Sequence, residues 1–422
     1  MNTDPASSVK ILHTSDWHLG RPLYGRSRHR EFEEFLDWLA GFVESEGVDA
    51  LFVSGDIFDT TTPGNRTQAL YYRFLHRVSR SSCRHVVVTG GNHDSPTFLD
   101  APKALLSALD VHVLGAVTGN PADEVLVLCD ARGEPEAVVC AVPYLRDRDI
   151  RTVEPGESAE DKNRKLVEGV ERHYAEVCRL ADETRNSLSM EIPLIATGHL
   201  FAAGGATMDG DGVREIYVGS LARIGRTAFP EAIDYLALGH LHVAQLVGGE
   251  EHLRYSGSPI PMGFSEAGQR KVVMLVEFSG RAPVVTELAV PCFRNLERLA
   301  GSLDELSVRI LGLRAAGTGA WLEIDYLGHE PALVVQERLE EAVAGSGLEI
   351  LRIRCGRNAR PSLGRSGDEE TLEELDREDV FRRCLDARGT DEALRPALIE
   401  CYREVLRSID EEDSMGETGA SA

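Results

Sequence analysis

Residues of the types that bind divalent metal ions follow five short apolar runs of this 422-residue chain. The runs cover residues 9–12, 50–53, 86–88, 194–196 and 235–238, and each has the length and β-branched character of a buried strand. Ligands of open α/β sheets collect beyond the carboxyl ends of the strands, so we expect one site to contain all five clusters. The ligand-type residues are Asp16, His18, Asp56, Asn92, His199, His240 and His242.

This donor set suits the hydrolysis of a phosphate ester by two metal ions. Two divalent ions about 3.5 to 4 Å apart can supply a hydroxide at neutral pH and neutralise the phosphate oxygens, and a carboxylate is the natural bridge between them. Imidazole, carboxylate and amide donors without thiolate are typical of catalytic manganese, iron or zinc, whereas a structural zinc site would normally include cysteine. None of the eight cysteines falls in a cluster. We expect two divalent ions, with Mn²⁺ as the first choice and iron, zinc and Mg²⁺ left open.

A single histidine of this kind is more often a hydrogen-bonded core residue, but five clusters in this order argue against coincidence. Together they resemble the calcineurin-like metallophosphoesterase superfamily, and their flanking sequences closely resemble its SbcD family of bacterial exonuclease subunits. The likeness covers residues 9–280 and continues more weakly to about 410. The matching strings are residues 11–20, 55–60, 90–95, 237–242 and 255–261.

The resemblance assigns roles to the ligands. It implies that one metal is held by Asp16, His18, Asp56 and His242. Asp56 would bridge to a second metal, whose other ligands would be Asn92, His199 and His240. His240 and His242 alternate along an extended segment and could therefore lean toward different ions.

Two further residues, His93 and Asp94, are candidates for catalysis. His93 resembles the catalytic histidine of the family, which stabilises or protonates the leaving oxygen, and the neighbouring Asp94 could orient its ring. A purely structural role for His93 stays open. Asp59 is the residue type that bacterial SbcD-like chains have at this position. It could hydrogen-bond a ligand, position substrate or cap a helix that begins near Pro63.

We expect an α/β protein: a metallophosphoesterase β-sandwich flanked by helices, a small α+β cap domain and a C-terminal helical tail. In the cap, 302–315 and 330–343 read as helices and 319–327 and 348–353 as strands. The cap could help choose DNA ends or could be a packing domain. The expected boundaries are 1–290 for the nuclease domain, 291–357 for the cap, 358–370 for a linker, 371–410 for a helical partner-binding segment and 411–422 for a disordered tail.

The composition opposes a nucleic-acid substrate, because 69 acidic and 45 basic residues give a net charge of −24, which repels a polyanion. A segment without acidic residues could nevertheless contact a phosphate backbone, although it could also be an ordinary solvated loop. Its arginines are Arg21, Arg26, Arg28 and Arg30. There is no long apolar stretch and no secretory signal in residues 1–10, so we expect a cytoplasmic protein with reduced thiols and no membrane contact.

The favoured function is a metal-dependent DNA nuclease. The resemblance implies 3′ to 5′ exonuclease action on duplex DNA and endonuclease action on single strands, in DNA end processing, repair and recombination. It also implies an SbcC-like ATPase partner, in a heterotetramer that contains a homodimer of this chain. The sequence has no phosphate-binding loop for ATP, in agreement with a separate ATPase. Folding of the helical tail onto the cap, a small phosphodiesterase or phosphatase, and a DNA-tethering scaffold without turnover are the alternatives.

Overall fold

The computed structural model describes residues 8–152, 156–202 and 224–355, together with the isolated positions 381, 385, 395, 396, 398, 399 and 402. The chain divides into two compact units, Met1–Cys355 and Gly356–Ala422. The expected linker at 358–370, the tail at 411–422 and most of the helical segment at 371–410 lie outside the described residues. Among the isolated positions, the rings of Phe381 and Tyr402 stack with centroids 4.1 Å apart, and Leu385 is buried.

The first of two large sheets has six strands in the order β12-β11-β1-β2-β3-β4. Strands β1 to β4 are parallel, and β11 pairs antiparallel with β1. The five apolar runs of the sequence coincide with strands, three of them in this sheet, with Val9 alone lying just before its strand, which confirms their prediction. The strands are β1 (Lys10–Thr14), β2 (Ala50–Ser54), β3 (His85–Thr89), β4 (Val111–Leu114), β11 (Val272–Ser279) and β12 (Ala282–Ala289).

The second sheet also has six strands, in the order β5-β6-β7-β8-β10-β9. Its central strands β6, β7, β8 and β10 are parallel, while β5 and β9 pair antiparallel at the two edges. The strands are β5 (Val125–Cys129), β6 (Pro135–Cys140), β7 (Leu194–His199), β8 (Tyr235–Gly239), β9 (Gln245–Val247) and β10 (Glu250–Tyr255).

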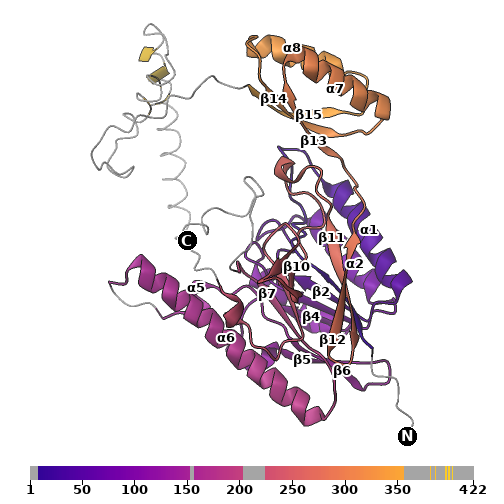
Figure 1. Cartoon of the computed structure of the whole chain (residues 1–422), viewed down its shortest axis with the longest axis vertical. Coiled ribbons are helices and arrows are strands. Elements are labelled where there is room, and N and C mark those ends of the chain that lie inside the picture. Colours follow the sequence, from indigo (N-terminus) through magenta and orange to yellow (C-terminus); the bar gives the residue numbers. More distant parts are fainter. Residues whose placement is uncertain are drawn as a thin grey trace, which may run out of the picture. The chain divides into compact units, whose positions relative to one another are not determined.

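The two sheets pack face to face, and helices cover their outer faces (Figure 1). Between the sheets, Phe52 and Val87 of the first share a core with Ile195 and Tyr235 of the second. Because both faces of each central strand are covered, these strands read as continuous apolar runs rather than alternating ones. This β-sandwich flanked by helices is the fold class predicted from the sequence.

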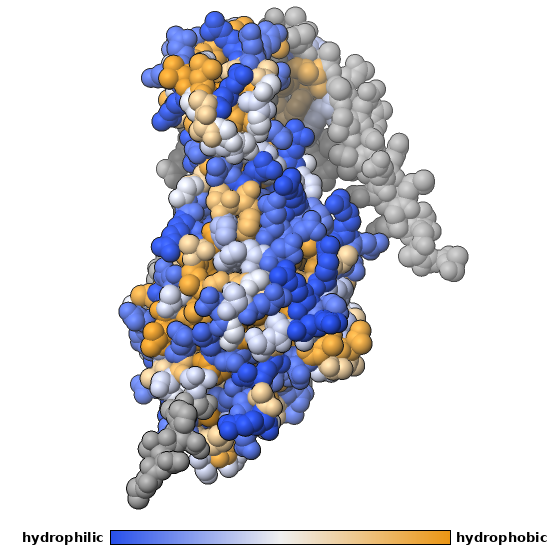
Figure 2. Space-filling view, turned by 90° about the vertical axis from the view of Figure 1, so that its right-hand side faces the viewer, coloured by the Kyte–Doolittle hydropathy of each residue, from blue (hydrophilic) through white to orange (hydrophobic). Residues whose placement is uncertain are grey.

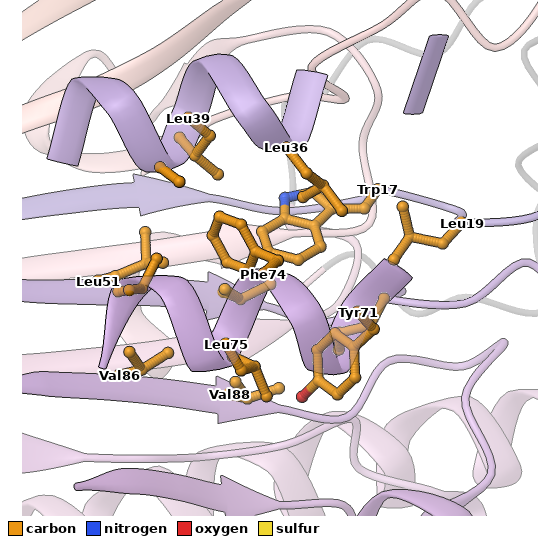
Figure 3. Packing of buried hydrophobic residues seen from close by; sticks show 14 of the residues in the cluster. Trp17, Leu19, Leu36, Leu39, Leu51, Tyr71, Phe74, Leu75, Val86 and Val88 are labelled. Carbon is orange, nitrogen blue, oxygen red and sulfur yellow. The ribbon is translucent and has the colours of Figure 1, made fainter. Parts of the chain in front are cut away.

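Helices α1 (His29–Glu46) and α2 (Asn65–Val78) cover the first sheet. Figure 3 shows Trp17 lying among Leu36 of α1 and Phe74 of α2, and the Trp17 and Phe74 rings meet edge to face at 5.3 Å. Trp17 is therefore a core residue, although it stands between two metal-type ligands. The second sheet is covered by α6 (Ala159–Leu188). The shorter helices are α3 (Pro96–Asp100), α4 (Lys103–Ser107), α5 (Asp147–Ile150), η1 (Pro121–Glu124), η3 (Arg226–Ala228) and η4 (Phe264–Glu266).

A separate three-stranded parallel sheet follows, with the order β13-β14-β15 and two helices packed on it. Helix α7 begins with a capping box between Ser302 and Glu305 and ends at Gly317, whose φ of 63° suits glycine. The helices and strands expected here are present, but the sequence did not reveal β13. The elements are β13 (Leu296–Gly301), α7 (Leu303–Ala316), β14 (Trp321–Tyr326), α8 (Ala332–Val343) and β15 (Glu349–Cys355).

The surface in Figure 2 is largely hydrophilic, with apolar residues gathered in small groups. Across the described part of the chain, no helix is both long and apolar enough to span a membrane.

Candidate metal centre

The sandwich brings the carboxyl ends of five parallel strands to one edge. Asp16 and His18 follow β1, Asp56 follows β2, and Asn92 follows β3. From the second sheet, His199 ends β7, while His240 and His242 follow β8. The structure thus brings together all seven residues that the sequence predicted as metal ligands.

One group of donors consists of Asp16, His18 and His242, whose ligand atoms all lie within 4.8 Å of one another. The Nε2 atoms of His18 and His242 are 3.1 Å apart. Both rings are buried. Two imidazole nitrogens that face each other this closely, with carboxylates beside them, form a site that a cation can occupy.

The other group contains Asn92, His199 and His240. The Oδ1 atom of Asn92 lies 2.9 Å from Nε2 of His199 and 3.1 Å from Nδ1 of His240. Asp56 lies between the two groups, because its Oδ2 is 3.4 Å from Nε2 of His199 and 3.6 Å from Nε2 of His18. A carboxylate in that position can contact two ions.

The ring of His199 shows that these residues fit a metal. Its Nδ1 lies 3.0 Å from the carbonyl oxygen of Ser54, and a carbonyl can only accept, so Nδ1 carries the proton. The lone pair on Nε2 then faces the oxygens of Asn92 and Asp56, which are acceptors themselves. Because Nε2 faces only acceptors, positive charge is required between them: a proton on Nε2 supplies it in metal-free protein, and a divalent cation can take its place. The same surroundings, chiefly the charge of Asp56, raise the pKa of His199 to about 9 against the opposing effect of burial.

Other ionisable groups at the centre also have shifted pKa values. Burial lowers the pKa of His18 to about 4 and that of His240 to about 3, so both rings are neutral at pH 7, the form that binds metal. Burial raises the pKa of Asp16. Although burial acts in the same direction on Asp56, its contacts with His199 hold the pKa of that carboxyl well below the usual range.

Strained backbone conformations accompany the ligands. Asp16, His18, Asp56 and His240 have φ values of 53°, 45°, 51° and 101°, in a region that residues other than glycine seldom occupy. Such strain clusters at functional sites because the surrounding structure has to hold it. Lack of space explains why a glycine stands at position 91 of the motif. A Cβ on Gly91 would lie 2.1 Å from Oδ1 of Asp56.

His93 lies beside the centre. Its backbone N–H donates to Oδ1 of Asp56 at 2.9 Å, and its ring Nδ1 lies 2.9 Å from the carbonyl oxygen of Asp59. The ring meets that of His18 edge to face, with centroids 4.8 Å apart. The contact to the carbonyl assigns the ring proton to Nδ1 and makes Nε2 the proton acceptor.

The structure corrects the role expected for Asp94. Its carboxylate does not orient the His93 ring but accepts hydrogen bonds from the backbone N–H groups of Ile57, Phe58 and Gly91 at 3.2, 3.0 and 2.9 Å. Buried backbone N–H groups need an acceptor, and the short, buried side chain of Asp94 supplies one for all three. Asp94 thus ties the loop after β2 to the loop after β3. Burial and the charge of Asp56 raise its pKa to about 6.

Asp59 faces a ligand instead of capping a helix. Its Oδ1 lies 3.5 Å from Nδ1 of His18 and 3.3 Å from Nη1 of Arg21. Helix α2 begins at Asn65 with Gly64 as its N-cap and no side-chain cap. Of the three roles considered, capping is therefore excluded.

The four candidate DNA-contacting arginines separate into different environments. Arg28 is buried, donates to both carboxylate oxygens of Glu31 at 2.7 Å and binds the carbonyl of Pro261, so the structure contradicts a DNA-contacting role for it. The side chains of Arg26 and Arg30 are 60% and 85% exposed, and each pairs with one glutamate. Arg21 is largely covered beside Asp59.

Two residues near the centre were not predicted from the sequence. Glu266 and Lys271 form a buried ion pair next to His242. Although burial opposes it, the close approach of His242 and the charge of Lys271 lower the pKa of Glu266 to about 2. Neither residue stands in a ligand-type cluster. The sequence around them is polar, with Ser265, Gln269 and Arg270 beside the pair, so it carried no signal that these two residues are buried.

The fold and the donor cluster define a metallophosphoesterase. In agreement, residues 9–244 match the model of the calcineurin-like phosphoesterase family, and residues 292–388 match the type 5 capsule protein repressor C-terminal domain. The chain is 36% identical over 408 residues to the SbcD subunit of the nuclease SbcCD of Escherichia coli (strain K12), covering 95% of this chain and 98% of that protein. This chain belongs to the SbcD family.

Further relatives carry the same name. The SbcD subunit of Rhodobacter capsulatus is 33% identical over 376 residues, which cover 84% of this chain and 89% of that protein. The Bacillus subtilis protein of that name is 36% identical over 271 residues, with 64% and 66% covered. The similarity extends over nearly the whole chain in the Escherichia coli protein and is confined to about two thirds of it in the Bacillus subtilis protein.

Proposed function

We propose that this chain is a metal-dependent DNA nuclease subunit that uses two Mn²⁺ ions. The observation that carries the proposal is the position of Asp56 between two groups of buried donors. One ion would be held by Asp16, His18, Asp56 and His242, and the other by Asp56, Asn92, His199 and His240. When bound, two such ions supply a nucleophile at neutral pH and neutralise charge on the phosphodiester.

His93 is the residue proposed to move a proton. The carbonyl of Asp59 accepts the Nδ1–H of the ring, so a second proton is carried at Nε2, and in that doubly protonated form the ring would give its Nε2 proton to the leaving oxygen of the cut strand. The hydrogen bond from the His93 backbone to Asp56 keeps the ring at a fixed distance from the metal ligands.

The DNA substrate follows from family membership and has modest electrostatic support. Arg26 and Arg30 are exposed and close in sequence to His18, so both could contact phosphates. The relatives are named as part of the nuclease SbcCD. By analogy we assign this chain 3′ to 5′ exonuclease action on duplex DNA and endonuclease action on single strands.

The name of these relatives, as one subunit of a nuclease, also supports a partner. We assign an SbcC-like ATPase to the helical segment 371–410, joined by the linker 358–370 and followed by the tail 411–422. The module at 291–357 would act as a cap on the nuclease domain, 1–290. The complete assembly would be a heterotetramer that contains two copies of this chain.

Cleavage of end-labelled single- and double-stranded DNA tests the proposal. The purified chain is incubated with Mn²⁺ beside its Asp56→Ala variant, and a nitrophenyl phosphodiester is included as a small substrate. Metal-dependent DNA cleavage that the variant loses would support the nuclease. Hydrolysis of the small ester with DNA untouched, also after addition of the ATPase partner, would instead indicate a small-molecule phosphodiesterase. Metal binding without any cleavage would indicate a tethering scaffold.

A further inference from the structure

The buried carboxylate of Glu266 lies next to the ring of His242, one of the proposed metal ligands. Oε1 of Glu266 lies 3.6 Å from Nδ1 of the His242 ring, and the two side chains are 0% and 2% exposed. Nε2 on the other side of the ring faces His18 across 3.1 Å. Glu266 therefore lies on the side of the ring away from the metal position, where a carboxylate can fix which nitrogen carries the proton.

The other oxygen of Glu266 is held by several donors. Its Oε2 accepts from the backbone N–H of Met262 at 3.1 Å and from the Ser258 hydroxyl at 3.4 Å, and it forms an ion pair with Lys271. These contacts come from three positions along the loop after β10. The carboxylate cannot rotate away from His242 without breaking them.

The side chain of Lys271 binds the backbone of the same histidine. Its Nζ donates to the carbonyl oxygen of His242 at 3.0 Å, to Ser258 Oγ at 3.0 Å and to Glu266. An ammonium group has three protons, and each finds an acceptor here. Both the ring and the main chain of His242 are thus held by one ion pair.

The turn that supplies Glu266 is itself anchored. Phe264 lies in the same short helix, η4, and stacks on Tyr24 with ring centroids 5.8 Å apart. The Tyr24 hydroxyl accepts a hydrogen bond of 2.8 Å from Arg352 of β15. Tyr24, in the loop after β1, therefore links the element that carries Glu266 to the three-stranded module.

Burying two charges costs free energy, and a buried ion pair is often no more stabilising than apolar residues of the same size. Stability of the fold is thus a weak reason for this pair, whereas its contacts to a metal ligand supply a specific one. We propose that Glu266 and Lys271 are positioning residues for His242: Glu266, whose Oε1 lies 3.6 Å from Nδ1, orients the ring electrostatically so that Nε2 points toward His18, where a metal would be held, and Lys271 holds both Glu266 and the His242 backbone. The inference rests on the proposed two-metal function.

Metal binding by the full-length chain tests this inference. Mn²⁺ is titrated into protein stripped with EDTA, and free Mn²⁺ is measured by its electron paramagnetic resonance signal. Wild-type protein should bind two ions. The Glu266→Gln variant should bind one of them roughly 10- to 100-fold more weakly, as is typical when a carboxylate behind a histidine ligand is lost, and the other with unchanged affinity.

Glu250→Gln is the matched control. Glu250 also pairs with a histidine, its Oε2 lying 3.4 Å from Nε2 of His252, and with Arg226; its side chain is 35% exposed, and within the described part of the chain neither partner is one of the proposed metal ligands. The control should bind both ions as the wild type does. If Glu266→Gln leaves an uncompensated Lys271 and does not fold, the double variant with Lys271→Met removes both buried charges and should show the same selective loss.

The outcomes separate the two proposals. A folded Glu266→Gln or double variant that binds both ions with wild-type affinity would overturn the positioning role while leaving the nuclease proposal intact. Wild-type protein that binds no Mn²⁺ would overturn the two-metal function and the inference with it.

Discussion

The ring of His199, at the end of β7, donates through Nδ1 to the carbonyl oxygen of Ser54, at the end of β2, across 3.0 Å. These residues belong to different sheets, so this hydrogen bond joins the two layers at the edge that carries the metal centre. It also fixes the orientation of the ring, with Nε2 directed toward Asp56 and Asn92. The packing of the sandwich and the chemistry of the centre are therefore coupled, and small displacements between the sheets should disturb the ligands.

Gly91→Ala should disrupt the centre without destroying the fold. The added Cβ would lie 2.1 Å from Oδ1 and 2.2 Å from the backbone nitrogen of Asp56, so the Asp56 carboxylate has to move. A displacement of about 1 Å can cost roughly 100-fold in rate, and we expect at least that loss in DNA cleavage, with weaker Mn²⁺ binding. Gly119→Ala is the control, since no atom lies within 4 Å of its added Cβ. Equal activity of the two variants would contradict the steric argument.

His93→Ala should lower cleavage by about 100- to 10,000-fold, the contribution typical of a positioned acid or base, and leave Mn²⁺ binding near the wild-type level. The reason is that His93 contacts Asp56 only through its backbone N–H, which alanine retains. Single-turnover cleavage together with a metal titration measures both effects. His76→Ala, on the exposed side of α2, serves as control. Retained cleavage would remove His93 from the mechanism.

Asp94→Asn should lower the free energy of unfolding. Asparagine keeps one acceptor oxygen but replaces the other with an NH₂ group, so at least one of the N–H groups of Ile57, Phe58 and Gly91 loses its partner. A buried donor left unsatisfied costs about 1–3 kcal/mol, which urea unfolding of metal-free protein can measure. If stability were unchanged while the pH profile of cleavage shifted, a role for Asp94 in tuning His93 would be restored.

Sequence reasoning worked where a local pattern decides the structure. Runs such as 50–53 and 235–238 are fully apolar because both faces of their strands are covered, and this composition is visible without coordinates. The ligands could be predicted to meet because parallel strands end at one edge. Strand β13 was missed because charged Glu297 and Arg298 interrupt its apolar residues, and one of its faces is polar.

Contacts between distant segments could not be predicted. The bonds of Asp94 to residues 37 and 36 positions earlier, and the proximity of Glu266 to His242, depend on how loops meet after folding. Arg28 illustrates the same limit: its charge suggested a phosphate contact, but it is buried against Glu31 and the distant Pro261. Charge alone does not reveal which arginine of a basic segment faces solvent.

Three of the four arginines can be told apart experimentally. Arg28→Ala leaves Glu31 as an unpaired buried charge and should cost about 3–5 kcal/mol of folding stability. Arg26→Ala and Arg30→Ala should leave stability unchanged and, if each side chain contacts a phosphate, should reduce the salt slope of DNA binding by about 1 per residue. Urea unfolding and DNA binding at several salt concentrations measure these effects. An unchanged slope in both surface variants would exclude this segment from the DNA interface.

His13 should make the fold sensitive to acid. It lies between the sheets, where its Nδ1 is 2.9 Å from the Tyr235 hydroxyl, and burial lowers its pKa to about 3, compared with about 6.5 in an unfolded chain. Between these values the unfolded state binds more protons, so the contribution of His13 to stability is fully present above about pH 6.5 and declines by about 1.4 kcal/mol per pH unit below it. Urea unfolding of metal-free wild-type and His13→Gln protein across this range isolates the effect, because all other histidines are common to both. Parallel curves for the two proteins would show that His13 is not the responsible group.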